Sequence, residues 1–289
     1  MTRTPPPVSP YTGEQQTLEA SRIVILPIPY EQTTTYLKGC RRGPAALMAA
    51  SGQMETYDDE LDGDVSTLGI HTALPVAEHA PTPEAMVKAV EEAVGRFLQL
   101  DKFVVSVGGE HSISFGVVRA FQEKFPGCGV IQLDAHGDLR TTYEGSPHNH
   151  ACVARRIFEV APFMHVGLRS CCSEEAELIR REGIAVIPAR TFLTRPEVAV
   201  EALDRMPDQI FLTIDMDFFD PSEVPGVGTP EPGGARWYDA LRFLRELTRR
   251  KRVVGFDVME LCPRQGEVIS EFFAAKLIYR LLGYIHLEG

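Results

Sequence analysis

Residues 129–138 read GVIQLDAHGD. The first five are mostly apolar, and a short apolar run of this kind predicts a strand that is buried on both faces, as in a parallel sheet. The strand ends directly in Asp134, His136 and Asp138. Since residues two apart on an extended segment point to the same side, these three polar side chains are expected to converge at the strand end.

A second stretch repeats this arrangement about eighty residues later along the chain. Residues 209–217 read QIFLTIDMD, so another apolar run ends in Asp215 and Asp217. Carboxylates gathered at the ends of neighbouring buried strands repel one another, and they stay ionised there only when cations lie among them. Four carboxylates and one imidazole can together hold two divalent ions, so the two stretches predict a metal centre.

Each stretch on its own has a simpler interpretation. A lone D-x-D is often a capped turn with solvated carboxylates, and a lone D-x-H-x-D can begin a helix. Two acidic clusters at two strand ends are much harder to explain as solvated turns. The metal interpretation is therefore preferred.

A third strand end adds one more candidate ligand. The apolar run at residues 103–107 leads into Gly108-Gly109-Glu110-His111-Ser112, where the glycines permit a tight turn toward a shared pocket. Alone, His111 would more simply be a capping or core histidine, but beside two acidic clusters it is predicted to be a sixth ligand. Carboxylates with two imidazoles and no thiolate suit Mn(II) better than Zn(II), with Fe, Co and Ni as open alternatives.

The rest of the chain alternates predicted strands with predicted helices. Strands are expected at residues 23–27, 103–107, 129–133, 162–166, 184–187, 209–214 and 252–256. Helices are expected near residues 44–51, 83–100, 112–124, 150–159, 173–182, 196–205, 237–250 and 267–282. This alternation predicts a single three-layer α/β/α domain, with a mainly parallel sheet of about eight strands covered on both faces.

A TIM barrel is the alternative for this number of strands. Roughly 75 turn-rich residues separate the first two predicted strands, which favours an open sheet over a barrel. Ligands of open parallel sheets bind outside the carboxyl ends of the strands. All three clusters of candidate ligands follow such ends.

Composition limits the class of protein. A chain of 289 residues, 44% of them hydrophobic, suits one large α/β domain. No stretch approaches 18 continuous apolar residues, so no membrane span is expected. Residues 1–10 contain four prolines and no apolar segment, which is unlike a secretory signal. Residues 1–22 are expected to form an N-terminal arm and residues 23–289 the catalytic domain.

Cysteine usage and charge indicate the compartment and the partners. The six cysteines show no C-x-x-C spacing, so they are expected to be reduced thiols of a cytoplasmic protein. A net charge of −11 argues against binding of nucleic acid or anionic membranes. The same charge fits a cationic substrate, although an acidic surface that only confers solubility explains it equally well.

Two divalent ions that share carboxylate ligands can ionise one water at neutral pH, so the predicted centre indicates a hydrolase without naming the bond. A phosphatase is the general alternative. It would also need Arg or Lys near the metals to hold its anionic substrate. Arg140 and Arg169 are the local candidates.

Six segments together resemble the ureohydrolase family, which includes agmatinase, arginase, guanidinobutyrase and formimidoylglutamase. They are GGEH at 108–111, DAHGD at 134–138, TIDMDFFDP at 213–221, KGCRRGP at 38–44, GTPEPGG at 228–234 and VGFDVME at 254–260. The resemblance covers essentially the whole chain from about Ile23, and it implies an arginase-like fold. It also implies a homo-oligomer, a trimer or a hexamer.

The resemblance assigns roles to individual residues. It implies one ion held by His111, Asp134, Asp138 and Asp215, and a second ion held by His136, Asp134, Asp215 and Asp217. Glu260 would hold the substrate guanidinium, because a planar guanidinium pairs bidentately with a carboxylate. Asp138 would carry a proton to the leaving amine. His150 would shuttle protons at the mouth of the site, with His148 as the competing candidate.

The loop after the DAHGD segment bears on the substrate. Arginases resemble one another in a Ser- and Asn-rich loop there, whereas this chain has Tyr143-Glu144-Gly145. Glu144 suits a cationic amine tail, and the loop resembles those of prokaryotic agmatinases. Agmatine is therefore the expected substrate and polyamine biosynthesis the expected route. N1-aminopropylagmatine and arginine are the alternatives within the family, and a non-catalytic metal-binding scaffold is the alternative outside it.

Overall fold

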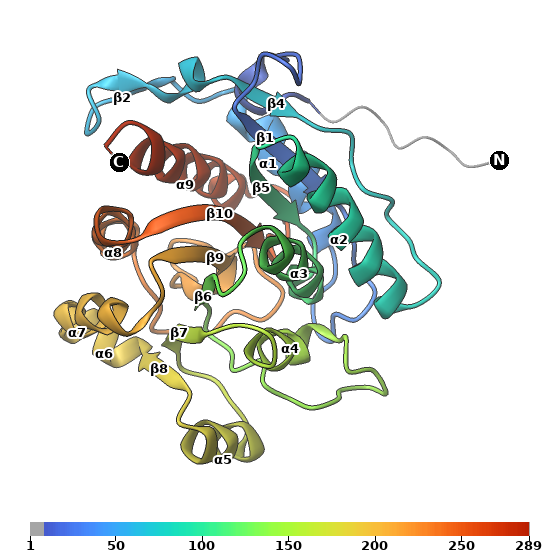
Figure 1. Ribbon diagram of the computed structural model, residues 1–289, viewed down its shortest axis with the longest axis vertical. Helices are drawn as coiled ribbons and strands as arrows, with labels where there is room; N and C mark the ends of the chain where they lie inside the picture. Colours follow the sequence, from blue (N-terminus) through green and yellow to red (C-terminus); the bar gives the residue numbers. More distant parts are fainter. Residues whose placement is uncertain (1–8, 289) are drawn as a thin grey trace.

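An open sheet of eight parallel strands runs through the middle of the computed structural model, which describes residues 9–288 (Figure 1). The strands in sheet order are β4 (Ile70–Thr72), β1 (Ile23–Ile28), β5 (Phe103–Gly108), β10 (Arg252–Met259), β9 (Gln209–Asp215), β6 (Gly129–Leu133), β7 (Phe163–Leu168) and β8 (Ala185–Pro188). Every neighbouring pair is parallel. Because β4 and β8 are the two edges, the sheet does not close into a barrel, and the predicted fold class is confirmed.

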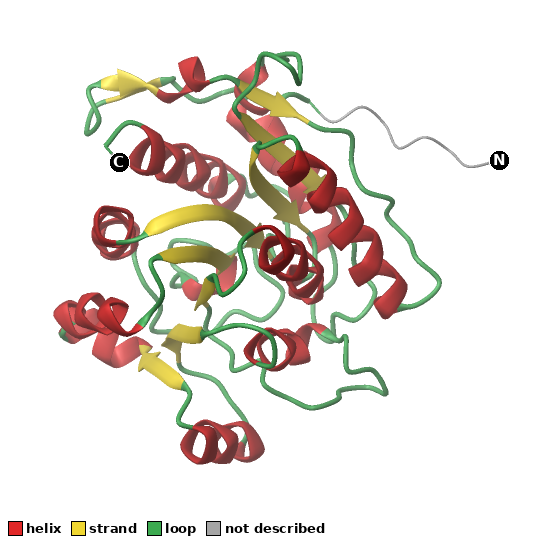
Figure 2. Cartoon of the chain, viewed as in Figure 1, coloured by secondary structure: helices red, strands yellow, loops and turns green. Residues whose placement is uncertain are grey.

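Helices cover both faces of the sheet (Figures 1 and 2). One face carries α2 (Pro83–Gln99), α3 (Ser114–Lys124), α4 (Val153–Phe158) and α5 (Ser173–Glu182). The other face carries α1 (Gly43–Ser51), α6 (Ala189–Thr194), α7 (Pro196–Ala202), α8 (Trp237–Arg250) and α9 (Ile269–His286). Alternate residues of a strand point to opposite faces, so Ile23 and Ile25 pack in one apolar core while Val24 and Leu26 pack in the other.

Several elements differ from the sequence-based expectation. The short edge strand β4 was not predicted, nor was the hairpin of β2 (Tyr57–Asp58) and β3 (Gly63–Asp64). The helix expected at 196–205 is present as α7, which continues into a 3-10 turn at Leu203–Arg205, but the short helix α6 that precedes it was not predicted. Short 3-10 turns lie at Tyr11–Gly13, Cys40–Arg42, Val65–Leu68, His111–Ile113, His150–Cys152, Leu203–Arg205 and Met216–Phe218.

The N-terminal arm predicted at residues 1–22 lies partly outside the described residues, which begin at residue 9. From Tyr11 onward the segment packs onto the core. The Tyr11 side chain is fully buried, and its hydroxyl donates a hydrogen bond to the Ala275 carbonyl of α9 at 2.7 Å. Across residues 9–288, no helix has both the length and the apolar character that a bilayer crossing requires.

Candidate metal centre and active-site cleft

Four neighbouring strands, β5, β10, β9 and β6, bring the predicted site residues to one edge of the sheet. Because all four strands are parallel, their carboxyl ends lie side by side. Glu110 and His111 follow β5, Glu260 follows β10, Asp215 ends β9 and Asp134 follows β6. Residues separated by more than a hundred positions in sequence therefore meet at one place.

Two groups of side chains at this edge have the arrangement of metal ligands. The first consists of His111, Asp134 and Asp215, and the second of Asp134, His136 and Asp217. Within each group the candidate ligand atoms all lie within 4.8 Å of one another, and Asp134 belongs to both. A carboxylate that belongs to both groups can serve two neighbouring divalent ions.

The nitrogen His111 Nδ1 lies at the centre of the first group. It is 3.1 Å from Asp215 Oδ2, 3.2 Å from Asp134 Oδ2 and 3.7 Å from Asp138 Oδ2. In the second group, His136 Nδ1 lies 2.8 Å from Asp217 Oδ2. All six predicted ligands are thus brought together, and five of them are buried, with His136 partly exposed.

The acidic clusters also form the capped turns considered as the simpler interpretation. Asp134 Oδ1 accepts a hydrogen bond from the His136 backbone N–H at 2.6 Å, and Asp215 Oδ1 accepts one from the Asp217 N–H at 2.8 Å. In both residues the other carboxylate oxygen, Oδ2, faces His111. One oxygen therefore fixes the turn and leaves the second oriented toward the centre.

A hydrogen bond with Thr213 fixes the orientation of the His111 ring. Its Nε2 lies 2.9 Å from Thr213 Oγ1, and the Thr213 hydroxyl is in turn 3.4 Å from Ser114 Oγ. Among the described residues, His111 Nδ1 has no hydrogen-bond partner although it is fully buried. A proton on Nε2 that is donated to Thr213 leaves the lone pair of Nδ1 free for an ion, as in histidine ligands generally.

The charges at the centre are not balanced by the protein. Burial, and then the negative charge of Asp134, raise the pKa of Asp138 well above its usual range. Burial, and then the negative charges of Asp217 and Asp134, do the same to the pKa of Asp215. Buried carboxylates that repel one another in this way are stabilised as anions by cations among them. The donor set and the bare Nδ1 of His111 therefore fit two divalent ions.

Glu260 is held beside the centre in a strained backbone conformation. Its φ of 61° lies in the left-handed region, which is costly for a residue with a side chain. Its backbone N–H donates to the Gly109 carbonyl at 2.8 Å, and its Oε1 accepts from the His111 N–H at 2.7 Å. The carboxylate is thus fixed between two strand ends, and burial raises its pKa well above the usual range.

A cleft of about 330 Å³ opens onto these groups. Five acidic residues line it, Asp138, Glu175, Asp215, Asp217 and Glu260, against one Arg or Lys, Arg140. A cleft with this balance of charge attracts cations and repels anions. Beyond the acids, Thr35, Tyr143 and His150 are among the residues that complete its wall.

The structure separates the two candidate proton carriers. His150 lines the cleft, with Nε2 3.4 Å from Thr35 Oγ1, whereas His148 lies outside it and stacks on Phe115. Burial, and then the positive charges of His136 and His111, lower the pKa of His150 to about 4. The imidazole is therefore neutral at pH 7 and able to accept a proton.

Glu144 is the one predicted site residue that, within the described part of the chain, reaches neither the cleft nor the metal centre. It is exposed, has a φ of 46°, and occupies the turn closed by the reciprocal hydrogen bonds of Tyr143 and Ser146. Its neighbour Tyr143 lines the cleft instead, with the Arg140 guanidinium 4.7 Å from its ring centroid. A contact between Glu144 and a substrate tail remains a prediction, for a tail that extends beyond the cleft.

Glu110 has a role that the sequence did not indicate. Its buried carboxylate accepts hydrogen bonds from the Gln32 and Thr33 backbone N–H groups at 2.5 and 2.6 Å. It also accepts from the hydroxyls of Thr33 and Ser112. Thr33 Oγ1 in turn accepts a hydrogen bond from the His150 backbone N–H at 2.9 Å. Because Glu110 directly precedes the candidate ligand His111, these bonds connect the metal centre to the cleft wall at His150. Glu110 and Thr33 are 77 positions apart in the sequence, so no local sequence pattern predicts that they pair.

The side chain of Arg169 is fully engaged by backbone carbonyl groups. Its guanidinium donates to the carbonyls of Asp217, Phe219 and Glu231, among others, at 2.6, 3.3 and 2.9 Å. These bonds lock the loop that carries Asp217 to the loop that carries Glu231. With Arg169 committed in this way and Arg140 stacked on Tyr143, residues 9–288 offer the cleft no free cation of the kind that a phosphatase needs.

Comparisons with known proteins agree with this geometry. The model of the Arginase family matches residues 21–283. An N(1)-aminopropylagmatine ureohydrolase from Synechocystis sp. is 48% identical over 94% of both chains, and an agmatinase from Pyrococcus horikoshii is 35% identical over 90% of both. The crystal structure of an agmatine ureohydrolase from Thermoplasma volcanium superposes with a TM-score of 0.89 at 28% identity, covering 99% of this chain and 97% of that one.

Proposed function

This chain belongs to the arginase family of ureohydrolases, and we propose that it hydrolyses the guanidinium group of N1-aminopropylagmatine to urea and spermidine. The observation that carries the choice of substrate is the 48% identity with the Synechocystis relative of that name. The loop at Tyr143-Glu144 had favoured agmatine as the expected substrate. The relatives support the longer alternative better, because the agmatinase from Pyrococcus horikoshii is only 35% identical.

The charge of the cleft supports a polycationic substrate. N1-aminopropylagmatine carries a guanidinium and two amines, all protonated at neutral pH, and has no carboxylate. We infer that the Glu260 carboxylate, held by the His111 N–H, pairs with the guanidinium end. The remaining acids of the cleft would attract the rest of the molecule, whereas the carboxylate of arginine would be repelled.

We propose two Mn(II) ions as cofactors. The residues that would hold them are His111, Asp134, Asp138, Asp215, His136 and Asp217. When bound, such ions lower the pKa of a shared water so that it is a nucleophile at neutral pH. A centre of oxygen and imidazole donors without thiolate supports Mn(II) among the first-row metals.

The chain's own groups would then guide the reaction. Glu260 orients the guanidinium carbon toward the carboxylate cluster, and the strained backbone at Glu260 fixes that orientation. Asp138 is placed to carry a proton to the leaving amine, because it borders both the cleft and the centre. His150, neutral and on the wall of the cleft, would exchange protons with solvent.

Agmatine is the second candidate, since it shares the guanidinium and a terminal ammonium. The two substrates differ only in the aminopropyl extension, so discrimination must come from the outer part of the cleft. Glu144 is the residue after Tyr143, which lines the cleft. We propose that it attracts the distal amine of the longer substrate. A role in polyamine synthesis, a cytoplasmic location and a homo-oligomeric state are proposed along with this substrate.

The test is urea release from N1-aminopropylagmatine, agmatine, arginine and 4-guanidinobutyrate with Mn(II) present. We expect the highest kcat/KM for N1-aminopropylagmatine, by about two- to fivefold over agmatine, which corresponds to one added contact with an exposed charge. Glu144→Gln should narrow that ratio, while Glu123→Gln, the same change on the exposed surface of α3, should not. An equal or higher value for agmatine would establish the second candidate, and a higher value for arginine would overturn both.

A further inference from the structure

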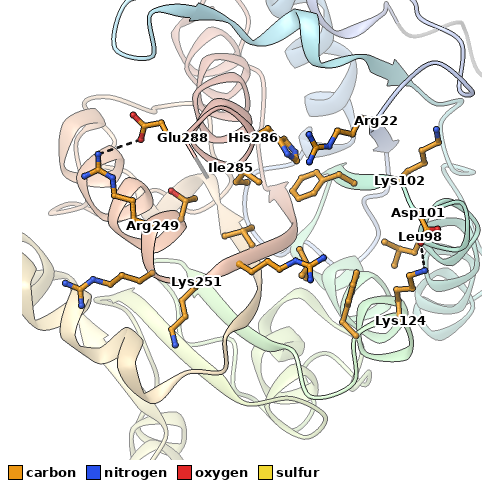
Figure 3. A pocket seen from close by; sticks show the side chains of 17 residues that line it. Arg22, Leu98, Asp101, Lys102, Lys124, Arg249, Lys251, Ile285, His286 and Glu288 are labelled. Atoms are coloured by element: carbon orange, nitrogen blue, oxygen red, sulfur yellow. Dashed lines mark hydrogen bonds and ion pairs between the residues drawn. The ribbon is translucent and has the colours of Figure 1, made fainter.

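A second cleft lies at the opposite end of the sheet from the metal centre. It measures about 730 Å³ and surrounds the amino-terminal starts of β5 and β10 (Figure 3). Seven Lys and Arg side chains line it, against two carboxylates, Asp101 and Glu288. This balance contrasts with the chain as a whole, whose net charge is −11. We call it the basic cleft.

Part of this positive charge has an ordinary structural explanation. The helices α2, α3, α8 and α9 all end at the basic cleft, and the carbonyl ends of helices favour cations. Lys124 lies in the last turn of α3, and Arg249 and Arg250 lie in the last turn of α8. Lys124 is also paired with Asp101 at 2.7 Å. These three cations need no ligand to account for them.

Four other cations lie outside the helices, and one of them, Lys251, is already bound by the Met206 carbonyl at 2.7 Å and by Asp208 at 3.7 Å. The remaining three stand at the starts of strands. Arg22 precedes β1, Lys102 precedes β5 and Arg252 begins β10, so one positive side chain stands at the start of each of three neighbouring strands. Neither Arg22 nor Arg252 forms an ion pair or a side-chain hydrogen bond with any residue from 9 to 288. Lys102 Nζ donates only to the Ser21 carbonyl, at 2.6 Å. Strand spacing of about 4.8 Å keeps these like charges close together.

A partly exposed histidine, His286, also lines the basic cleft. Figure 3 shows His286 beside Arg22. Its Nε2 is buried and has no hydrogen-bond partner among the described residues. Burial, and then the charge of Arg22, lower the pKa of His286 to about 4. A neutral imidazole nitrogen can donate or accept, so this unpartnered atom offers a ligand one further hydrogen bond beside Arg22.

The floor of the basic cleft is apolar. Leu98 and Ile285 line it together with the rings of Phe103 and Phe125. The volume is in the range of sites for small molecules and cofactors, which combine apolar walls with a few placed polar groups. Guanidinium groups pair bidentately with phosphate oxygens, and exposed arginines without carboxylate partners are suited to this role.

We propose that the basic cleft binds a small polyanion that carries several phosphate groups, with Arg22, Lys102 and Arg252 as the phosphate contacts. The ligand chemistry has two sources, a nucleoside polyphosphate or an inorganic polyphosphate. An apolar floor beside the cations suits the first, because a nucleobase would cover the aromatic rings. This site is independent of the substrate proposed for the metal centre.

Calorimetric titration of the metal-loaded enzyme, with Mg²⁺ in excess, would test the proposal using ATP, tripolyphosphate and adenosine as probes. We expect saturable binding of ATP and tripolyphosphate that weakens as salt increases, and no binding of adenosine. Similar affinities for ATP and tripolyphosphate would identify the phosphate chain as the recognised part. Tighter binding of ATP than of tripolyphosphate would show that the nucleobase is recognised as well. Failure of both to bind at millimolar concentration would overturn the proposal.

Charge-reversing variants test whether the polyanion binds in the basic cleft. Arg22→Glu and Arg252→Glu should each weaken binding by about tenfold, since each replaces an attraction with a repulsion. Arg190→Glu makes the same charge change at an exposed position on α6, outside the basic cleft, and should leave the affinity unchanged. Equal affinities in wild type, Arg22→Glu and Arg252→Glu would place the binding elsewhere, for instance at the metal centre, and would contradict the proposal. Melting temperatures and urea release of both variants would verify that they are folded.

Discussion

Replacing Glu110 by alanine removes the acceptor of four hydrogen bonds that hold the cleft wall. The hydroxyls of Thr33 and Ser112 can rotate toward other acceptors, but the backbone N–H groups of Gln32 and Thr33 cannot. The Thr33 N–H is buried, and a buried N–H left without a partner costs about 1–3 kcal/mol, whereas water can replace the lost acceptor at the exposed residue Gln32. In a chain of this length a melting temperature moves by about 2 °C per kcal/mol, which gives a fall of roughly 2–6 °C.

Thermal unfolding followed by circular dichroism measures this effect, and urea release measures its consequence for catalysis. Because Thr33 also holds the backbone of His150, kcat/KM should fall together with the melting temperature. Glu110→Gln keeps the volume and one acceptor oxygen, so it should lie between wild type and Glu110→Ala. Glu123→Ala, an exposed change on α3, is the control. A Glu110→Ala protein that melts within 1 °C of this control would refute the assigned role.

Three further predictions concern the cleft. Glu260→Gln should keep its metals and lose about 10²–10³ in kcat/KM, measured by urea release, because a neutral amide cannot form the charged pair with the guanidinium. His150→Asn should lower kcat by about 10² with little change in KM, as expected for a proton carrier that does not bind substrate. Arg169→Lys should cost about 2–3 kcal/mol in the free energy of unfolding in urea, because an ammonium has fewer donors for the carbonyls that Arg169 now binds; unchanged stability would show those bonds to be dispensable.

The sequence was most informative where apolar runs end in acidic residues. A strand of a parallel sheet is buried on both faces, so β6 and β9 are almost continuously apolar and their ends are sharp. The residues that follow must lie at the carboxyl edge, where neighbouring strands bring them together. For this reason Asp134 and Asp215 could be placed in one site before their distance was known.

Features that depend on contacts between distant segments could not be predicted in this way. The edge strand β4 has only three residues, too few for a periodic pattern. The pairing of Glu110 with Thr33 and the carbonyls bound by Arg169 depend on loops that fold over the sheet. The exposure of Glu144 follows from a turn with a positive φ, which a Glu side chain does not signal. The sequence indicated the loop that contributes Tyr143 to the cleft, but Glu144 lies in the turn of that loop and is exposed.

Metal content tests most directly the claim that the acidic strand ends form one binuclear site. Wild-type enzyme and Glu260→Gln, loaded with Mn(II) and freed of excess metal, should each contain two ions per chain by elemental analysis. Asp134 belongs to both ligand groups, so Asp134→Asn should contain one ion or none and should lose most urea release. Two retained ions in Asp134→Asn, or a single ion in the wild type at saturating Mn(II), would contradict the account.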